Sequence, residues 1–267
     1  MQEVKTEMQE REQAIEHKMR FEMPQSELRT IFEYFKRCLT NVVLFHASDD
    51  GVRIAAVDPA HVATGVVYIN KGCMKDYRVT DNHTFALDLE SLKGSLLLLK
   101  DKQAMLTFIQ NGDEITITGG DGFTKTVSVS DEYTSVKIPE IKYESGGVVD
   151  SGDFYAAVNM AADINDTIKL TGDGNNLVVS AYRDERHKIT VEAPLKLKAG
   201  GFKNEVTTIP AEYLKNAAAS LKHFDLMVRI SGGQKKTDIM PLKINFKRTV
   251  LNGEIKGYIL IAPRMEQ

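Results

Sequence analysis

The sequence predicts an α+β protein made of two similar domains, and three observations lead to this fold class. Short segments of alternating apolar residues, bounded by turn residues, are typical of strands; residues 52–57, after the Asp49-Asp50-Gly51 turn, are an example. A few longer segments have apolar residues at helical spacing, as Leu28, Ile31 and Phe35 do. The same order of elements then occurs twice along the chain, which indicates an internal duplication.

The first repeat begins with a strand over residues 19–23. A helix follows, opened by Pro24 with Ser26 as its cap. Its apolar face is formed by residues at helical spacing, namely Leu28, Ile31, Phe32, Phe35 and Leu39. A second helix is expected over residues 89–100, with Leu92, Leu96 and Leu99 on its apolar face. The expected strands after the first helix cover residues 42–47, 52–57, 62–69, 84–87, 104–110, 114–118 and 123–129.

The second repeat begins with a helix over residues 151–162. Another helix is expected over residues 210–222, with Pro210 suited to its first turn. The expected strands cover residues 167–170, 177–182, 188–193, 206–209, 224–230, 240–246 and 257–261. The pair Leu28 and Phe154 has the same separation as the pair His61 and His187, which supports the duplication.

The repeats define the expected domain boundaries. Residues 1–18 are nearly all polar, so we expect an extension that is disordered or forms a frayed helix, and translation from Met19 would omit it. Residues 19–129 form the first domain and residues 144–267 the second. Residues 130–143 fit neither repeat and are expected to connect the two.

Composition indicates an ordinary soluble protein without a membrane segment. Hydrophobic residues make up 42% and charged residues 27% of the chain. Apolar runs such as residues 96–99 are far shorter than a membrane span, and the polar N-terminus has no signal core. Cys38 and Cys73 show no pairing pattern, so we expect reduced thiols. The net charge of −3 argues against a protein that grips DNA by charge alone.

No catalytic motif occurs in the sequence. Phosphate-binding and dinucleotide-binding glycine loops, the G-x-S-x-G elbow and the C-x-x-C pair are all missing. The six histidines have no metal-ligand spacing. Residues 119–122 are better explained as a hairpin turn than as a phosphate loop, because no helix follows them. We therefore expect no enzymatic activity, no cofactor and no metal.

Several segments resemble the proliferating cell nuclear antigen (PCNA) family of sliding DNA clamps, particularly its archaeal members. Residues 136–143, VKIPEIKY, resemble the interdomain connector of that family, and residues 55–62, AAVDPAHV, its strand and loop before the third strand. Residues 240–242, MPL, and 260–266, LIAPRME, resemble its last strands and tail. The similarity runs from about Met19 to Gln267 in both repeats.

The resemblance implies a clamp fold that assembles as a homotrimeric ring of six similar domains, with helices lining the hole and sheets outside. Such a ring encloses duplex DNA without reading its sequence. It is opened by a clamp loader and tethers DNA polymerase, ligase, nuclease and other replication and repair proteins that carry a PCNA-interacting peptide. Symmetric closure agrees with the physics, since two domains cannot surround a duplex and open strand edges need partners.

The resemblance also assigns three sets of residues. The strand over residues 123–129 of one subunit would pair with about residues 186–192 of the next, through Phe123, Lys125, Val127, Val129, Lys188, Thr190 and Glu192. The residues that would face the DNA phosphates are Arg29, Lys36, Arg37, Lys93, Lys100, Lys215 and Lys222. A pocket for partner peptides would be built from Val57, His61, Val62, Val136, Ile138, Pro139, Pro241, Leu260, Ala262, Pro263 and Met265.

Two departures from the family pattern stand out. The helix over residues 151–162 has no lysine or arginine where the family usually offers basic side chains, and strand residues such as Arg53 or Lys188 are candidates to compensate. Leu260 stands where many eukaryotic clamps have tyrosine, which predicts a more apolar pocket floor. For any single residue a simpler interpretation stays open: solvated surface for a lysine, and core for Val57 or Leu260.

Alternative functions also stay open. The chain could belong to a heterotrimer, act as a monomeric viral processivity factor, or serve as an interaction scaffold without DNA function. We expect a cytoplasmic, nucleoid-associated location for an archaeal protein, and a nuclear or host replication site for a eukaryotic or viral one.

Overall fold

The computed structural model describes residues 17–92, 104–119, 122–130, 133, 135–184, 188–230 and 240–264. Three α-helices occur in this part of the chain: α2 (Gln25–Cys38), α3 (Ser151–Ala162) and α4 (Ala211–Leu221). Two short 3₁₀ turns are η1 (Lys71–Cys73) and η2 (Leu89–Leu92). The first-half strands are β1 (Met19–Pro24), β2 (Val42–Ser48), β3 (Gly51–Val57), β4 (Ala63–Asn70), β5 (Lys75–Val79), β6 (His83–Asp88), β7 (Met105–Asn111), β8 (Glu114–Gly119) and β9 (Thr124–Ser128). The second-half strands are β10 (Gly146–Val149), β11 (Thr167–Gly174), β12 (Asn176–Asp184), β13 (Lys188–Lys196), β14 (Ala199–Pro210), β15 (Asp225–Arg229), β16 (Leu242–Val250) and β17 (Gly253–Ile261).

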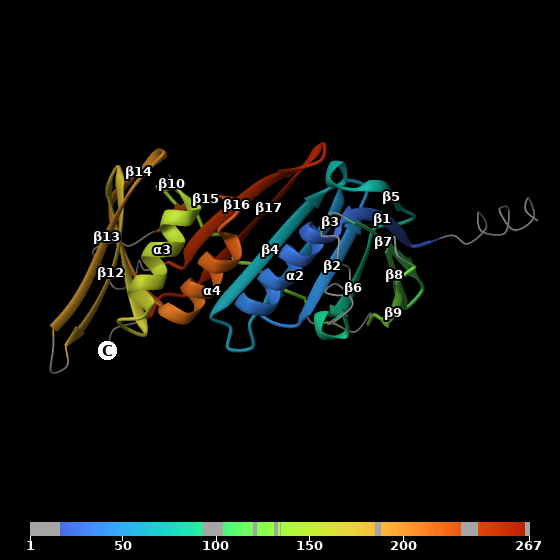
Figure 1. Ribbon diagram of the computed structural model, residues 1–267, viewed down its shortest axis with the longest axis horizontal. Helices are drawn as coiled ribbons and strands as arrows, with labels where there is room; N and C mark the ends of the chain where they lie inside the picture. The colour runs from blue at the N-terminus through green and yellow to red at the C-terminus, as the bar shows by residue number, and fades with distance from the viewer. Residues whose placement is uncertain are drawn as a thin grey trace, which may run out of the picture.

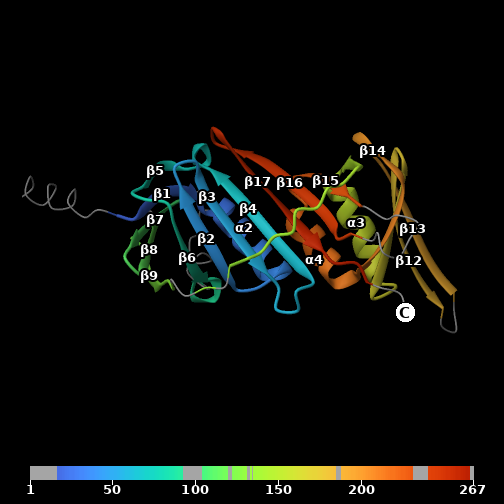
Figure 2. The same cartoon turned by 180° about the vertical axis from the view of Figure 1, so that it is seen from behind.

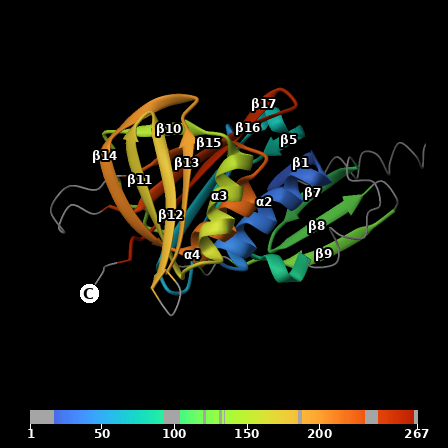
Figure 3. The same cartoon turned by 60° about the vertical axis from the view of Figure 1, so that its left-hand side comes forward.

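These strands form two sheets. The smaller sheet has the order β5-β1-β7-β8-β9, and the larger, twelve-stranded sheet has the order β13-β12-β11-β14-β10-β15-β16-β17-β4-β3-β2-β6. The larger sheet runs through both halves of the chain because β17 pairs with β4 over seven residue pairs. Strands β13 and β9 are each the last strand of their sheet, and they lie at opposite ends of the molecule (Figures 1 and 3).

The helices and the connecting segment lie on opposite sides of the larger sheet. Helices α2, α4 and α3 form a row on one face, with α4 in contact with both neighbours (Figure 1). Their apolar residues, such as Phe35, Phe154 and Leu214, are fully buried against the sheet. The chain between β9 and β10 crosses the other face (Figure 2). No helix in the described residues combines the length and the apolar character that crossing a bilayer requires.

The junction between β4 and β17 is tightly packed around two glycines. Tyr34 of α2 donates a hydrogen bond to the Tyr258 carbonyl at 3.2 Å, and its ring packs edge-on against Phe246 at 5.3 Å. A side chain at Gly65 would meet Tyr34, and one at Gly257 would meet the Val66 carbonyl. Glycine is therefore required on both sides of the junction for steric reasons.

Replacing Gly257 with alanine is expected to lower the free energy of unfolding by about 2–3 kcal/mol, because the new Cβ would clash with a backbone oxygen that cannot move without breaking the sheet. The Cβ would also lie 2.6 Å from the Phe246 ring. Urea unfolding followed by circular dichroism measures the change. Gly152→Ala in the first turn of α3 is the matched control, since its Cβ would meet only the Asp150 side chain at 3.2 Å. An unchanged midpoint for Gly257→Ala would contradict the packing argument.

Helix α3 begins at a true side-chain cap. Asp150 accepts hydrogen bonds from the amides of Gly152 at 2.9 Å and Asp153 at 3.1 Å, and from Lys198 Nζ at 2.8 Å. The Lys198 hydrogen bond, followed by the helix amides, lowers the pKa of Asp150. A carboxyl whose pKa is lower in the folded state stabilises the protein above its unfolded-state pKa, and this contribution is lost as the pH falls through the folded pKa.

We expect Asp150→Ala to lower the free energy of unfolding by about 1 kcal/mol at neutral pH. The difference from the unmodified protein should shrink below about pH 4, where the capping carboxylate takes up its proton. Thermal unfolding measured across pH values tests both points. Lys198→Ala keeps the two amide bonds and should have the smaller effect; equal losses for both variants would argue against capping.

Most predicted elements are present, with corrections at particular residues. Ser26 is not a helix cap: Pro24 precedes the first turn, no side-chain cap occurs, and the Ser26 carbonyl accepts from the Thr30 hydroxyl. Pro210 likewise precedes α4 rather than lying in its first turn. Of the helix expected over residues 89–100, only the 3₁₀ turn at residues 89–92 is described, and the rest lies outside the described residues. Strands β5 and β10 were not predicted from the sequence.

Candidate functional site

A cavity of about 1090 Å³ lies where the connecting segment, the loop after β3 and the end of β17 meet. It brings together most of the residues expected to bind partner peptides, namely Val57, His61, Val62, Val136, Pro139, Pro241, Leu260 and Ala262. Leu260 is buried at its floor, whereas His61 and Pro139 are exposed at its edge. Ile138 and Pro263 are half-buried but do not line the cavity, and Met265 lies outside the described residues.

Sequence reasoning missed another wall of this cavity. Val42 and Leu44 of β2, Thr64 of β4 and Tyr133 of the connecting segment also line it. In β2 the buried residues Val43 and Phe45 alternate with Val42 and Leu44, so the strand is apolar on both faces. Val42 is 52% exposed. The signal in the sequence that could have revealed this wall was an apolar residue on the outer face of a predicted strand.

The loop of residues 58–62 is held in place by the Asp58 carboxylate, which is 3% exposed. One carboxylate oxygen accepts from the Ala63 amide at 2.5 Å. The other accepts from the Ala60 amide at 3.1 Å and from the Tyr213 hydroxyl at 2.8 Å. Because Tyr213 belongs to α4, the second half of the chain fixes a loop of the first half. Burial and the Asp58 charge raise the pKa of Tyr213 to about 12, so its hydroxyl stays a donor.

Further contacts fix the remaining walls. The Ala262 amide donates to the Val62 carbonyl at 2.8 Å, which joins the end of the chain to the Asp58 loop. The Arg264 amide donates to the Thr208 carbonyl of β14 at 2.8 Å, which holds the segment after β17. The Tyr143 hydroxyl donates to the Pro241 carbonyl at 2.5 Å and so anchors the end of the connecting segment. The cavity is therefore largely preformed, which reduces the entropy lost when a ligand binds.

The row of helices carries fewer free cations than the sequence suggests. Among the described residues, Lys36 pairs with Glu90 at 2.8 Å, Lys215 with Asp163 at 3.2 Å, and Arg37 lies 3.5 Å from Glu33. Arg29 and Lys222 are exposed. Lys93 and Lys100 lie outside the described residues. Ion pairs on this face reduce the positive charge that it offers to phosphates.

Arg53 does not compensate for the missing charge on α3. It neighbours Tyr68 across β3 and β4, and its guanidinium lies 6.0 Å from the Tyr68 ring. The adjacent Ile54 is buried on the helix side, so Arg53 points away from the helices. Lys188 lies exposed on the edge strand β13. The outer surface of α3 instead carries Asp153 and Met160, which is 50% exposed.

The two edge strands carry the residues expected at a subunit interface. On and beside β9, Val127 is buried, whereas Phe123, Lys125 and Val129 are half-buried. On β13, Lys188, Thr190 and Glu192 are exposed, and so is Ile189 at 40%. One side of each strand has no partner among the described strands. Such edges favour pairing with another chain.

The described residues show neither a metal-binding cluster nor an exposed thiol. They contain no group of three or more histidine, cysteine, aspartate or glutamate side chains arranged to hold a metal ion. Cys38 and Cys73 are free and buried. Burial raises the pKa of Cys38 to about 12 and that of Cys73 to about 11, so both thiols stay protonated.

Comparison with known proteins identifies the fold and its relatives. The family model described as "Proliferating cell nuclear antigen, N-terminal domain" matches residues 18–138. A DNA polymerase sliding clamp of Thermoplasma acidophilum is 27% identical over 227 residues, which cover 84% of this chain and 89% of the relative. A DNA polymerase sliding clamp of Methanococcus maripaludis is 25% identical over 241 residues, covering 85% and 92%.

Solved structures show the same fold. The structure of A. fulgidus PCNA with the C-terminal region of FEN-1 bound to it has a TM-score of 0.79 at 19% identity, covering 93% of this chain and 99% of that one. The PCNA2–PCNA3 complex of Sulfolobus tokodaii has a TM-score of 0.76 at 20% identity, covering 92% and 100%. The predicted α+β clamp fold is confirmed.

Proposed function

We propose that the chain is a non-enzymatic DNA polymerase sliding clamp of the PCNA family, and that three copies of it close into a ring around duplex DNA and tether replication proteins by their peptides. One observation carries this proposal: three stretches far apart in sequence build a preformed cavity of about 1090 Å³ under the connecting segment. A related clamp was solved with the C-terminal region of FEN-1 bound to it. A short peptide with apolar anchors is the ligand that such a cavity fits.

The edge strands support the ring. Strand β9 ends the smaller sheet and β13 the larger one, at opposite ends of the molecule, so each subunit offers one edge to the neighbour on either side. In this arrangement α2, α3 and α4 face the hole, and residues 19–129, 130–143 and 144–267 act as first domain, connector and second domain. The ion-paired cations on the helices support retention by enclosure rather than by strong phosphate contacts.

The experiment measures oligomeric mass and peptide binding on the same sample. Light scattering at micromolar concentration should give three times the chain mass, and a peptide from the C-terminus of a FEN-1-type nuclease should bind with a saturable signal. The clamp, once loaded, should stimulate a DNA polymerase. A stable monomer that binds no such peptide would refute the proposal.

A ring of different clamp chains is the second candidate. The similar Sulfolobus tokodaii structure is a complex of two different clamp chains, and α3, which has no lysine or arginine, departs from a uniformly basic hole. Purification of the tagged protein from its own cells, followed by native mass measurement, separates the two assemblies. Recovery of other clamp chains in fixed proportion would favour the mixed ring.

A further inference from the structure

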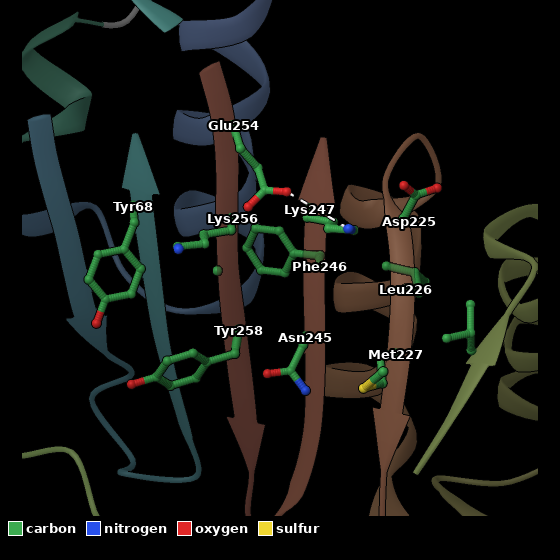
Figure 4. A pocket seen from close by; sticks show the side chains of 12 residues that line it. Tyr68, Asp225, Leu226, Met227, Asn245, Phe246, Lys247, Glu254, Lys256 and Tyr258 are labelled. Carbon is green, nitrogen blue, oxygen red and sulfur yellow. Dashed lines mark ion pairs between the residues drawn. The ribbon is translucent and has the colours of Figure 1, made fainter. Parts of the chain in front are cut away.

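A second cavity of about 500 Å³ lies on the outer face of β4, β17, β16 and β15 (Figure 4). Ile244 and Phe246 of β16 are buried on the helix side, where Phe246 contacts Tyr34. Asn245 and Lys247 alternate with them and therefore face outward. This cavity shares no lining residue with the cavity under the connecting segment.

The surface of this cavity is aromatic and apolar. Tyr258 lies beside Asn245, which in turn lies beside Met227, so these three side chains form one row across three strands. Tyr68 begins a parallel row and is 36% exposed (Figure 4). Two tyrosine rings and a methionine give this part of the outer sheet face an exposed apolar area.

Four cations, Arg53, Lys243, Lys247 and Lys256, lie around these rings, against two carboxylates in the cavity lining, Asp225 and Glu254. Lys243 lies over the Tyr258 ring at 4.3 Å, and Lys256 lines the cavity beside Tyr68. Lys247 is 3.9 Å from Glu254, and both of those side chains are largely solvated. No described carboxylate lies within ion-pair distance of Lys243 or Lys256. Burial, followed by the charge of Arg229, lowers the pKa of Lys243.

The chain itself contains a segment of complementary chemistry. Residues 1–16, which lie outside the described residues, include five glutamates against one lysine and one arginine. Met1, Val4, Met8 and Ile15 provide apolar side chains between those charges. An acidic segment with spaced apolar residues matches a surface of tyrosines and lysines in both charge and polarity.

The attachment point of this segment lies within reach. The His17 carbonyl accepts from the Thr80 hydroxyl at 2.8 Å, just after the end of β5. Strand β5 spans about 17 Å and begins next to η1. The Gly72 carbonyl of η1 accepts from the Asn252 amide at 3.1 Å, in the hairpin that leads to Glu254 and Lys256. Sixteen extended residues span about 50 Å, which exceeds the distance from His17 along β5 and η1 to the hairpin before Glu254.

We propose that the N-terminal segment, residues 1–16, docks on the outer cavity, with its apolar residues on Tyr68 and Tyr258 and its glutamates against Lys243, Lys247 and Lys256. The docked segment covers a face that the helices and the connecting segment leave open. It lies beside the partner pocket, because Tyr258 and Leu260 are successive outward-facing residues of β17.

A binding experiment with a shortened chain tests the proposal. The chain that begins at Met19 is titrated into a fluorescent peptide of residues 1–16, and anisotropy is measured. We expect saturable binding that weakens at least about tenfold in the variant Lys247→Glu with Lys256→Glu, and that falls with added salt. Lys169→Glu, on the exposed face of β11, is the matched control and should bind as the unmodified chain does.

Exchanging the charges of the peptide and the chain distinguishes loss of a charge contact from misfolding of the variant. A peptide with Glu7 and Glu10 replaced by lysine should bind the double Lys→Glu variant better than it binds the unmodified chain. In the full-length chain, a photo-crosslinking residue at position 8 should join to peptides from β4, β16 or β17. Absence of binding, equal binding by a scrambled peptide of the same composition, or crosslinks confined to other faces would overturn the proposal.

Discussion

Replacing Ile189 with aspartate is expected to convert the assembled ring into single chains at micromolar concentration. Ile189 lies on the edge strand β13 and is 40% exposed in the isolated chain. In the proposed ring this strand pairs with β9 of the neighbour, so a carboxylate at position 189 would be buried without a partner. Such a group weakens association by several kcal/mol, which raises the dissociation constant by at least about 100-fold.

The control for this prediction is Val206→Asp. Val206 is also 40% exposed, but it lies on β14, an interior strand of the same sheet. Sedimentation velocity of both variants, with circular dichroism to establish folding, separates an interface effect from a general effect of charge. If Ile189→Asp sediments as the unmodified assembly does, β13 is not the edge that joins subunits.

The second large effect is expected at Asp58. Asp58→Ala leaves the Ala60 and Ala63 amides and the Tyr213 hydroxyl without their acceptor. Loss of a buried acceptor with three donors should lower the free energy of unfolding by about 3 kcal/mol. The loop would also lose the conformation that positions His61 and Val62, so we expect partner-peptide affinity to fall at least about tenfold.

Tyr213→Phe isolates the contribution of the second domain. It removes one donor and keeps both loop amides on Asp58, so it should lower stability by about 1 kcal/mol and weaken peptide binding less than Asp58→Ala does. In the Asp58→Ala background the same change should have almost no further effect, because the two side chains act through one contact. Calorimetric peptide titrations of the four proteins complete the cycle. Additive losses would show that α4 does not hold the pocket loop.

The sequence pattern predicted most elements because each has one buried apolar face and one more exposed face. In α2 and α4 the apolar side chains face the sheet, and strands such as β7 alternate between buried and half-buried residues. Strand β5, KDYRV, escaped prediction because it is polar and lies at a sheet edge. Strand β10, GGVV, escaped because half of its residues are glycine, which has low strand propensity.

The candidate site was less accessible from sequence. Motif resemblance brought Val57, Val136 and Leu260 together, since no local pattern links stretches so far apart. The contact between Asp58 and Tyr213 joins residues 155 positions apart, in different halves of the chain, and only packing reveals it. The ion pairs that occupy Lys36 and Lys215 likewise depend on where Glu90 and Asp163 lie after folding.

The pairing of β17 with β4 has a mechanical consequence. A force that bends the chain between its halves acts on seven residue pairs of one continuous sheet, and these must shear together before the halves can separate. The packing of Tyr34 against Phe246 stiffens the same region. Each chain should therefore behave as a rigid arc, and the compliance of an assembled ring should be concentrated at the joints where β9 meets β13.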